Sequence, residues 1–500
     1  MTGLEVGETT ALVLLAAHIV LGFVATVLVS ANRRPSAAIA WVLTIVFIPF
    51  LGALAYLLVG RSRLPRARRE KQAEVNELVL ARTAGLSLVS HGDEWPSWLH
   101  SVVALNRNLG ALPMVGGNTA ELIDDYEGSL RAMTAAIDGA TESVHVEFYI
   151  LVLDDATRPF FEALARAVAR GVEVRVLSDH LAGFLQSNRR ETQAFLRGAG
   201  IPWQGMLPLR PLRGQWQRPD LRNHRKIVVV DGAVGFTGSQ NLIDSSYLKP
   251  KNVKRGLHWH EVMVRLTGPV VRELDAVFVT DWYSETDELL PLDTAPVVLP
   301  VPAPAPVSPG VPGASDGLVD AQVLPSGPAF ENENNLKLFA ALIHKAERRV
   351  SITSPYFVPE ESVLLAIVTA ASRGLAVELF VSEIGDQALV HHAQRSYYEA
   401  LLRAGVRIYL YRPPTVLHSK HFTVDEEVAV IGSSNMDIRS FSLNLEVSVL
   451  VHGRTFVDRM RAIEDSYRAE STLLTLDAWL ARPVRGKVWD SLARLTSSLQ

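Results

Sequence analysis

The sequence predicts an α/β protein in which an N-terminal two-helix transmembrane hairpin precedes two duplicated α/β units that share one site. Two uncharged, apolar runs stand near the start of the chain, at residues 11–31 and 37–60. Beyond residue 110 the sequence contains an internal duplication, and each of the two copies alternates helical stretches with strand-like stretches. Strands that alternate with helices are typical of units built on a mostly parallel or mixed sheet.

The composition excludes several classes of protein. The 500 residues are 48% hydrophobic and carry a net charge of −4, which is too apolar for a disordered chain and too long for one ordinary domain. There is no cysteine, so disulfides, thiolate-bound zinc and cysteine nucleophiles are excluded. A pI near 6.4 argues against a nucleic-acid binder, which needs a basic excess to meet the phosphate backbone.

Each apolar run is long enough to cross a bilayer, because about twenty helical residues span the roughly 30 Å hydrocarbon core. Glu5 and Glu8 precede the first run, and this acidic leader argues against a secretory signal peptide. Pro49 predicts a kink in the second run. Two basic residues lie in the turn between the runs and six follow the second run: Arg33 and Arg34, then Arg61, Arg63, Arg66, Arg68, Arg69 and Lys71. This imbalance predicts that the α/β units lie on the cytoplasmic side. The six residues act either as that topology signal or also as a contact for anionic lipid.

The organisation that we expect is a hairpin over 1–60, a basic linker over 61–110, a first unit over 111–290, a Pro-rich linker over 291–325 and a second unit over 326–500. Seven prolines between residues 296 and 312 predict an extended spacer. The first unit also carries about eleven extra residues within 202–223. We expect this segment either to contact lipid head groups or to form a polar surface loop. Its conspicuous side chains are Trp203, Trp216, Arg210, Arg213 and Arg218.

The repeated motif carries the chemistry. His224-Arg-Lys-Ile-Val-Val-Val-Asp231 matches His418-Ser-Lys-His-Phe-Thr-Val-Asp425, and Gly-Ser-x-Asn follows seven residues after each Asp. Residues two apart on a strand share a face, so each His points the same way as the Lys that follows it. An imidazole beside an ammonium suits an oxyanion, and the Ser and Asn side chains add donors for phosphate oxygens. The predicted phosphate-binding residues are Ser239, Asn241, Ser433 and Asn435.

Two such motifs facing each other place two imidazoles on opposite sides of one phosphorus atom. One imidazole attacks in line and the other protonates the leaving oxygen, which requires neither a metal nor another cofactor. The candidate catalytic residues are His224, Lys226, Asp231, His418, Lys420 and Asp425. Asp231 and Asp425 face away from the histidines on a regular strand, which favours a local structural role for them.

Each histidine also needs an acid that fixes its tautomer. The candidates are Glu446, which lies 28 residues after His418, and Glu261, which closes the sequence His258-Trp-His-Glu261. A metal site at His258 and His260 is an alternative interpretation of that sequence.

At these residues the sequence resembles the phospholipase D superfamily and, within it, the bacterial cardiolipin synthases. The resemblance covers nearly the whole chain. The matching stretches are Ala40-Trp41 with Pro49, Asn223-His-Arg-Lys226, Val416-Leu-His-Ser-Lys420, Ser354-Pro-Tyr-Phe-Val-Pro359, and Gly432-Ser-Ser-Asn-Met-Asp-Ile-Arg-Ser440 with Asn444 and Glu446. The resemblance implies phospholipase D-like α/β sandwich units in a multi-pass enzyme of the bacterial cytoplasmic membrane.

The resemblance also implies the reaction: two phosphatidylglycerol molecules give cardiolipin and glycerol through a phosphatidyl-histidine. His224 is our choice of nucleophile, and His418 then protonates the departing glycerol. The expected partners are phosphatidylglycerol and anionic membrane lipid, and no nucleic acid. Alternatives are another lipid or water as acceptor, a phosphodiesterase acting on lipid or nucleic acid, and a non-catalytic membrane scaffold. The acceptor, the order of the two histidines and the oligomeric state stay open.

Overall fold

The computed structural model describes residues 3–30, 35–60, 64, 66–83, 89, 95–210, 218–291, 317–328, 330 and 333–495. Its contacts divide the chain into two units. The smaller unit comprises residues 1–63 together with 218–220, and the larger unit comprises 64–217 and 221–500. Each unit is described by itself below.

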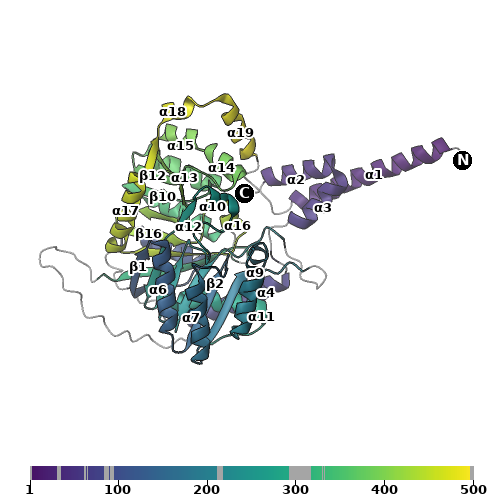
Figure 1. The fold of residues 1–500 in the computed structure, drawn as a ribbon. Helices are drawn as coiled ribbons and strands as arrows, with labels where there is room; N and C mark the ends of the chain where they lie inside the picture. Colours follow the sequence, from purple (N-terminus) through teal and green to yellow (C-terminus); the bar gives the residue numbers. More distant parts are fainter. Residues whose placement is uncertain are drawn as a thin grey trace. The chain divides into compact units, whose positions relative to one another are not determined.

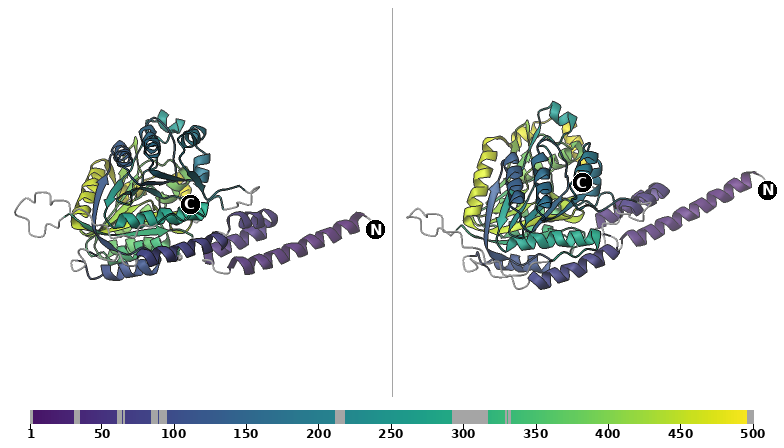
Figure 2. Two further views of the ribbon diagram at one scale, coloured as in Figure 1. Left: turned by 90° about the horizontal axis from the view of Figure 1, so that it is seen from below. Right: turned by 60° about the horizontal axis from the view of Figure 1, so that its bottom comes forward.

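The smaller unit consists of three helices, α1 (Gly3–Ser30), α2 (Pro35–Phe47) and α3 (Pro49–Val59). Figure 2 shows α1 as one unbroken helix in purple. The second helical run is divided at Ile48, because Pro49 lacks the N–H that would continue α2 and instead occupies the first turn of α3. The helices pack around a small core that contains Ala25, Val29 and Ile45.

Over the described residues, no helix combines the length and the apolar composition that crossing a bilayer requires. The predicted transmembrane hairpin is therefore not supported. For the second run the physical reason is the break before Pro49, which leaves helices of 13 and 11 residues where a span needs about twenty. Arg33, Arg34, Arg61 and Arg63, on which the predicted orientation depended, lie outside the described residues.

The larger unit begins with two helices in the stretch that we expected to be a linker. In α4 (Arg66–Thr83), Arg68 forms an ion pair with Glu285, and Lys71 forms one with Asp287 at 2.5 Å. These two members of the basic cluster therefore have partners within the protein. The next helix, α5 (Leu99–Asn108), packs into the core around α12 (Asn334–Lys345).

The larger unit is built on one mixed sheet of fifteen strands, in the order β19-β13-β12-β10-β15-β16-β18-β9-β1-β8-β6-β5-β2-β3-β4. The order is nearly symmetric about the antiparallel pair of β1 (Val115–Ile123) and β9 (Val319–Ser326). The predicted duplication thus corresponds to two half-sheets joined edge to edge. We call residues 115–286 the first half and residues 319–494 the second half; Figure 1 shows them in blue to teal and in green to yellow.

The other elements of the first half are α6 (Tyr126–Asp138), β2 (Ser143–Phe148), α7 (Arg158–Ala169), β3 (Glu173–Asp179), α8 (His180–Phe184), α9 (Arg189–Gly198), β4 (Trp203–Met206), β5 (Lys226–Val230), β6 (Val234–Gly238), α10 (Pro250–Lys254), β7 (His258–His260), β8 (Met263–Thr267) and α11 (Val270–Thr286). Those of the second half, after β9 and α12, are β10 (Arg349–Thr353), β11 (Phe357–Val358), α13 (Glu361–Ser372), β12 (Ala376–Ser382), α14 (Ala388–Arg395), α15 (Tyr398–Ala404), β13 (Arg407–Tyr411), β14 (Thr415–Leu417), β15 (His421–Val424), β16 (Val428–Gly432), β17 (Met436–Asp437), α16 (Ile438–Ser442), β18 (Glu446–His452), α17 (Arg454–Ala469), β19 (Ser471–Leu474), α18 (Leu476–Leu480) and α19 (Val484–Arg494).

Helices cover both faces of the sheet, and every residue of β5 and β16 is accordingly buried. One face of the first half packs against α6 and α7, which lie side by side in Figure 1, and the corresponding face of the second half packs against α12 and α13. Residues of α11 and α17 join strands of both halves in a third core. The two halves therefore form one folded body.

The two extra segments of the sequence differ in how much of them is described. Within 202–223, Trp203 lies in β4 and its indole N–H donates to Ser178 Oγ at 2.9 Å. Arg213 and Trp216 lie outside the described residues, as does the Pro-rich stretch at 296–312. A lipid contact by the 202–223 segment therefore stays a prediction.

Candidate active site

The backbone of each motif histidine is held by the opposite half of the protein. The N–H of His224, just before β5, donates to the carbonyl of Leu445 at 2.8 Å. The N–H of His418, just after β14, donates to the carbonyl of His260 at 2.9 Å. Leu445 and His260 are the residues that immediately precede the two candidate glutamates. The two halves thus approach each other through a pair of equivalent, short parallel contacts.

These contacts give each histidine a carboxylate from the other half. His224 Nδ1 lies 2.9 Å from Glu446 Oε2, and His418 Nδ1 lies 2.7 Å from Glu261 Oε1. A carboxylate accepts only, so each Nδ1 carries the proton and each Nε2 keeps the lone pair that can react. The structure thus brings together all four residues, and the pairing crosses between the halves.

Both glutamates remain ionised although they are fully buried. Burial alone raises the pKa of Glu261, but His418 and Lys420 outweigh burial, and the net pKa is lowered. The pKa of Glu446 is lowered in the same way, mainly by His224. Ionised partners of this kind stabilise an imidazolium whenever one forms during a reaction.

The histidines themselves are neutral at rest. Burial lowers the pKa of His224 to about 4 against the opposing effect of Glu446. Burial also lowers the pKa of His418, which Glu261 and then Asp386 partly offset. An unprotonated imidazole is a nucleophile, so His224 is ready to attack in the resting site.

The two lysines supply positive charge inside the same buried site. The Lys226 Nζ donates to the carbonyl of His224 at 2.6 Å, and the Lys420 Nζ donates to that of His418 at 2.7 Å. Burial lowers the pKa of Lys226 to about 7 and that of Lys420 to about 8. The charges of Glu261 and Glu446 both raise the pKa of each lysine, because the two motifs lie close together. A bound phosphodiester would favour the charged form of both ammonium groups.

The glycine of each Gly-Ser-x-Asn motif is required by the packing of the backbone. A Cβ atom at Gly238, whose φ is +148°, would lie 2.4 Å from the carbonyl oxygen of Val262. A Cβ atom at Gly432 would lie 2.3 Å from that of Val447. Both contacts are far inside van der Waals distance. Glycine therefore lets the segment that follows each glutamate lie against the motif.

The four predicted phosphate-binding residues lie in this region, and they contact protein groups. Ser433 Oγ donates to Glu446, whereas Ser239 Oγ accepts from the N–H of Val262 at 3.0 Å. Asn241 Nδ2 donates to the hydroxyl of Tyr247 at 2.9 Å. Asn435 Oδ1 is buried and has no hydrogen-bond partner among the described residues. These side chains build the glutamate pockets, and phosphate binding by them stays a prediction.

Asp231 and Asp425 lie away from this cluster, at the opposite ends of β5 and β15. Asp231 accepts from the backbone N–H groups of Thr141, Glu142 and Ser143 at 2.8–2.9 Å. Asp425 makes the equivalent contacts with residues 347–349. A catalytic role for the two aspartates is not supported by this placement. Their carboxylates instead fix the start of the neighbouring strand in each half.

Several site residues were not singled out in the sequence, although Tyr356 and Ser440 lie in stretches that carry the resemblance. The ring of Tyr149 packs edge-on to that of His224, with 5.1 Å between the ring centroids. The ring of Tyr356 packs edge-on to that of His418, with 5.9 Å between the centroids. Tyr247 donates from its hydroxyl to Glu261 Oε1 at 3.0 Å, and Ser440 donates to Glu446 Oε1 at 2.8 Å. Tyr149 directly follows β2, but nothing in its spacing distinguishes it from a core aromatic residue.

His258 and His260 do not gather further ligands. His258 Nε2 lies 2.8 Å from Thr415 Oγ1, and the ring of His260 packs against Tyr467 at 5.3 Å. Within the ranges that the structure describes, no three His, Asp or Glu side chains group as metal ligands would. The alternative of a metal site at these histidines has no third ligand there.

Comparison with known proteins places this site in a family. Residues 133–282 and 339–466 match the family described as "Cardiolipin synthase, PLD-like domain", and residues 12–61 match "Phospholipase_D-nuclease N-terminal". The chain is 32% identical to cardiolipin synthase A of Proteus mirabilis over 472 residues, which is 94% of each chain. It is also 32% identical to the cardiolipin synthase of Geobacillus kaustophilus, over 95% of this chain and 91% of that one.

A solved structure supports the fold. The phosphatidylserine synthase of Haemophilus influenzae superposes with a TM-score of 0.59 at 14% identity and covers 79% of this chain and 99% of its own. The match over most of the sequence, together with the two paired motifs, shows that the chain belongs to the cardiolipin synthases, the phosphatidyltransferases with phospholipase D-like domains.

Proposed function

We propose that the protein transfers a phosphatidyl group from one phosphatidylglycerol to another, which gives cardiolipin and glycerol. The observation that carries this proposal is the pair of crossed contacts, His224 with Glu446 and His418 with Glu261. Two oriented imidazoles and two buried ammonium groups around one space suit the displacement of one phosphodiester oxygen by another. Both motifs keep every reacting group, which disfavours the non-catalytic scaffold.

In the first step, His224 Nε2 attacks the phosphorus of the donor lipid while the bond from phosphorus to the glycerol oxygen breaks. His418, which takes up a proton at Nε2 when the anionic phosphodiester binds, gives that proton to the departing oxygen, so neutral glycerol leaves. In the second step, a hydroxyl of the acceptor lipid gives its proton to His418 and its oxygen attacks phosphorus. The bond between phosphorus and His224 then breaks and the enzyme is regenerated.

The electrostatics favour His224 as nucleophile and His418 as acid. Both histidines have a buried glutamate, but Asp386 adds a second negative charge that favours the protonated form of His418. The pKa of His224, lowered to about 4, keeps that imidazole unprotonated. The acid must carry a proton and the nucleophile must lack one. Because the extra carboxylate of Asp386 favours the protonated form of His418, we assign His418 as the acid.

The test is lipid product analysis after the full chain is incubated with phosphatidylglycerol vesicles. We expect cardiolipin and glycerol in equal amounts. Phosphatidic acid in place of cardiolipin would show that water is the acceptor and that the protein is a phospholipase D-type phosphodiesterase. Unchanged lipid would contradict both activities and favour the scaffold.

We also propose that the small N-terminal unit associates with lipid. Large apolar side chains stand exposed along its helices, among them Phe23 at 71%, Phe47 at 77% and Phe50 at 75%. An exposed apolar surface of this extent marks a membrane or protein contact. Flotation with phosphatidylglycerol vesicles tests this: Phe47→Ser with Phe50→Ser should weaken binding. A matched change at the exposed Trp489, in α19, should leave it unaltered, and equal binding by both variants would contradict the proposal.

A further inference from the structure

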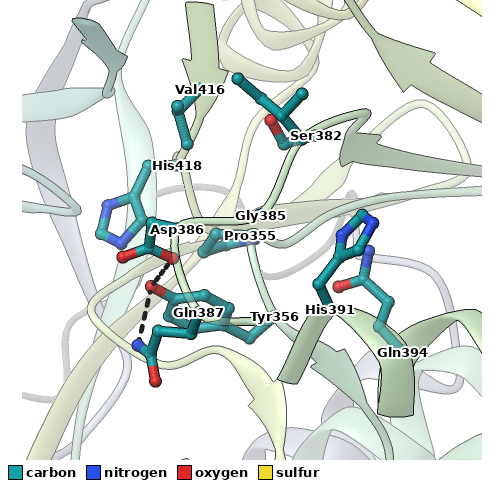
Figure 3. A pocket seen from close by; sticks show the side chains of 11 residues that line it. Pro355, Tyr356, Ser382, Gly385, Asp386, Gln387, His391, Gln394, Val416 and His418 are labelled. Carbon is teal, nitrogen blue, oxygen red and sulfur yellow. Dashed lines mark hydrogen bonds between the residues drawn. The ribbon is translucent and has the colours of Figure 1, made fainter. Parts of the chain in front are cut away.

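A small pocket adjoins His418 in the second half (Figure 3). It lies where β12 and β14 end, and its walls include Ser382, Asp386, Val416 and Tyr356. Its enclosed volume is about 10 Å³, which is room for about one oxygen-sized group such as a water or a hydroxyl. None of the features used so far accounts for this space.

The internal duplication shows why the pocket exists on one side only. The strands β3 and β12 correspond, and they end at Asp179 and Ser382. The residues two before the motif histidines are Arg222 and Val416. In the first half Arg222 Nη1 donates to Asp179 Oδ1 at 3.1 Å, and both side chains are buried. A large ion pair therefore stands in the first half where the second half has a serine and a valine.

The lining of the pocket is suited to a neutral hydroxyl. Ser382 is 4% exposed, and its Oγ has no hydrogen-bond partner among the described residues. Tyr356 donates its hydroxyl to Asp386 Oδ1 at 2.9 Å and accepts from Gln387 Nε2 at 3.2 Å, as the dashed lines in Figure 3 show. Each carboxylate oxygen has lone pairs for about two donors, so Asp386 retains acceptor capacity.

The charges at the pocket favour a neutral group. The carboxylate of Asp386 lies 3.9 Å from Lys249 Nζ. These opposite charges offset each other, so neither a phosphate nor an ammonium head group gains much attraction there. A hydroxyl can donate to the carboxylate of Asp386 or accept from Ser382 Oγ, and either contact offsets the cost of desolvating it.

We propose that this pocket binds a free hydroxyl of the glycerol head group, both when glycerol leaves the donor lipid and when the acceptor lipid attacks. This inference rests on the proposed function. It adds that the site selects a polyol by binding one of its free hydroxyl groups. The pocket places that hydroxyl beside the histidine that exchanges the proton with the neighbouring oxygen. Asp386 and Ser382 are then specificity-determining residues, and Arg222 and Asp179 prevent the same binding next to His224.

The test is a competition between free alcohols as acceptors. Phosphatidylglycerol vesicles are incubated with the full chain and equal concentrations of perdeuterated glycerol, 1-propanol and ethanolamine, and the phosphatidyl products are counted by mass spectrometry. In each transfer the bond from phosphorus to His224 breaks, a bond to the alcohol oxygen forms, and the alcohol proton passes to His418. The readout is a ratio within one sample, so it does not depend on the folded fraction.

We expect the wild-type protein to prefer glycerol over 1-propanol by about tenfold or more, because a site that hydrogen-bonds a hydroxyl rejects the analogue that lacks it. Asp386→Asn combined with Ser382→Ala should reduce that ratio to within about threefold. Glu383→Gln is the matched control: it removes the same charge from an exposed side chain three residues away, and its ratio should equal that of the wild type.

Three results would overturn the inference. The first is a ratio that stays unchanged in the double variant, and the second is a wild-type ratio near one. The third is a double variant that loses only ethanolamine transfer, which would show that the pocket recognises an ammonium group. Failure of the proposed function looks different, because vesicles without added alcohol then yield phosphatidic acid or unchanged lipid and no cardiolipin.

Discussion

His224 Nδ1 lies 2.9 Å from Glu446 Oε2, although 222 residues separate the two in the chain. The symmetric contact joins His418 to Glu261 across 157 residues. Neither motif is therefore complete within its own half. A glutamate of the second half orients His224, and a glutamate of the first half orients His418.

Replacing the two glutamates by glutamine should separate the two half-reactions. We expect Glu446→Gln to slow formation of the phosphatidyl-histidine on the order of 100-fold, because the orienting acceptor of the nucleophile is weakened. Glu261→Gln should slow turnover of phosphatidylglycerol, but it should spare adduct formation from a p-nitrophenyl phosphodiester, whose leaving group needs no proton. Rapid-quench intact-mass spectrometry measures both. Equal effects of the two changes on both substrates would contradict the division of roles.

Removing either histidine should abolish cardiolipin formation, with different residual chemistry. His418→Ala should still form a slow adduct with the p-nitrophenyl substrate, whereas His224→Ala should form none, because the attacking atom is gone. Peptide mapping of the quenched protein locates the adduct. An adduct on His418 in the His224→Ala protein would reverse the assignment, and substantial turnover by either variant would reject the shared site.

The dependence of kcat/KM on pH should be bell-shaped. The rate should rise as pH passes about 4, where His224 loses its proton and becomes a nucleophile. It should fall first as His418 loses the proton that the leaving glycerol needs, and further between about pH 7 and 8, where Lys226 and then Lys420 lose the charge that attracts the phosphodiester. Lys226→Met should remove the lower part of the alkaline fall. A profile that keeps rising above pH 8 would show that the ammonium groups do not bind the substrate.

Asp231 should matter for stability rather than for turnover. Asp231→Ala removes a carboxylate that holds three backbone N–H groups, and it puts alanine at a φ of +51°. We expect a loss of about 2–3 kcal/mol in the free energy of unfolding, with kcat unchanged. Asp231→Asn keeps an acceptor and tolerates the backbone conformation, so it should lose less. The pKa of Asp231 is lowered by the backbone N–H groups against the effect of burial. The contribution is therefore complete above the unfolded pKa, and it should disappear as pH falls through the folded one.

Arg225 is predicted to hold the two halves together behind the site. Its guanidinium is buried, forms an ion pair with Asp281, and donates to the carbonyl of Glu446 at 3.0 Å. Arg225→Met leaves Asp281 buried without its partner and should cost about 3–5 kcal/mol of unfolding free energy. Arg225→Met with Asp281→Leu should recover much of that stability but not the rate of adduct formation, because Glu446 loses its anchor. Arg265→Met, at a half-exposed position whose arginine pairs with Glu121 at 3.5 Å, is the control and should cost less than about 1 kcal/mol.

Because imidazoles supply both the nucleophile and the acid, turnover should persist in excess chelator. The measurement is cardiolipin formation by the full chain before and after dialysis against chelator. Loss of turnover that zinc or magnesium restores would contradict the two-histidine mechanism.

The duplicated fold and the reacting residues could be predicted from the sequence because they repeat. The spacing of His224 and Lys226, copied at His418 and Lys420, predicts one face of one strand, whereas both histidines lie just before the strands β5 and β15. The crossed partners could not be predicted, because Glu261 and Glu446 fit either histidine until the contacts between Leu445 and His224 and between His260 and His418 are known. Such contacts depend on how the halves dock, and no local pattern encodes docking.

Other parts of the site and fold depend on a comparison that no motif provides. The pocket at Ser382 arises because Ser382 and Val416 are smaller than their counterparts in the first half, Asp179 and Arg222. This difference becomes visible only when the two halves are compared position by position. Likewise, an average of hydropathy over residues 37–60 does not detect that Pro49 divides the run into two short helices.

The crossed pairing also has a consequence for the order of events at the ribosome. The strands of the first half are complete by Thr267, but Glu446 is synthesised 222 residues after His224. Until then, a nascent chain carries a nucleophile that nothing orients. The emerging protein therefore has no complete site with which to cleave phospholipid until β18, the strand that begins with Glu446, has been synthesised.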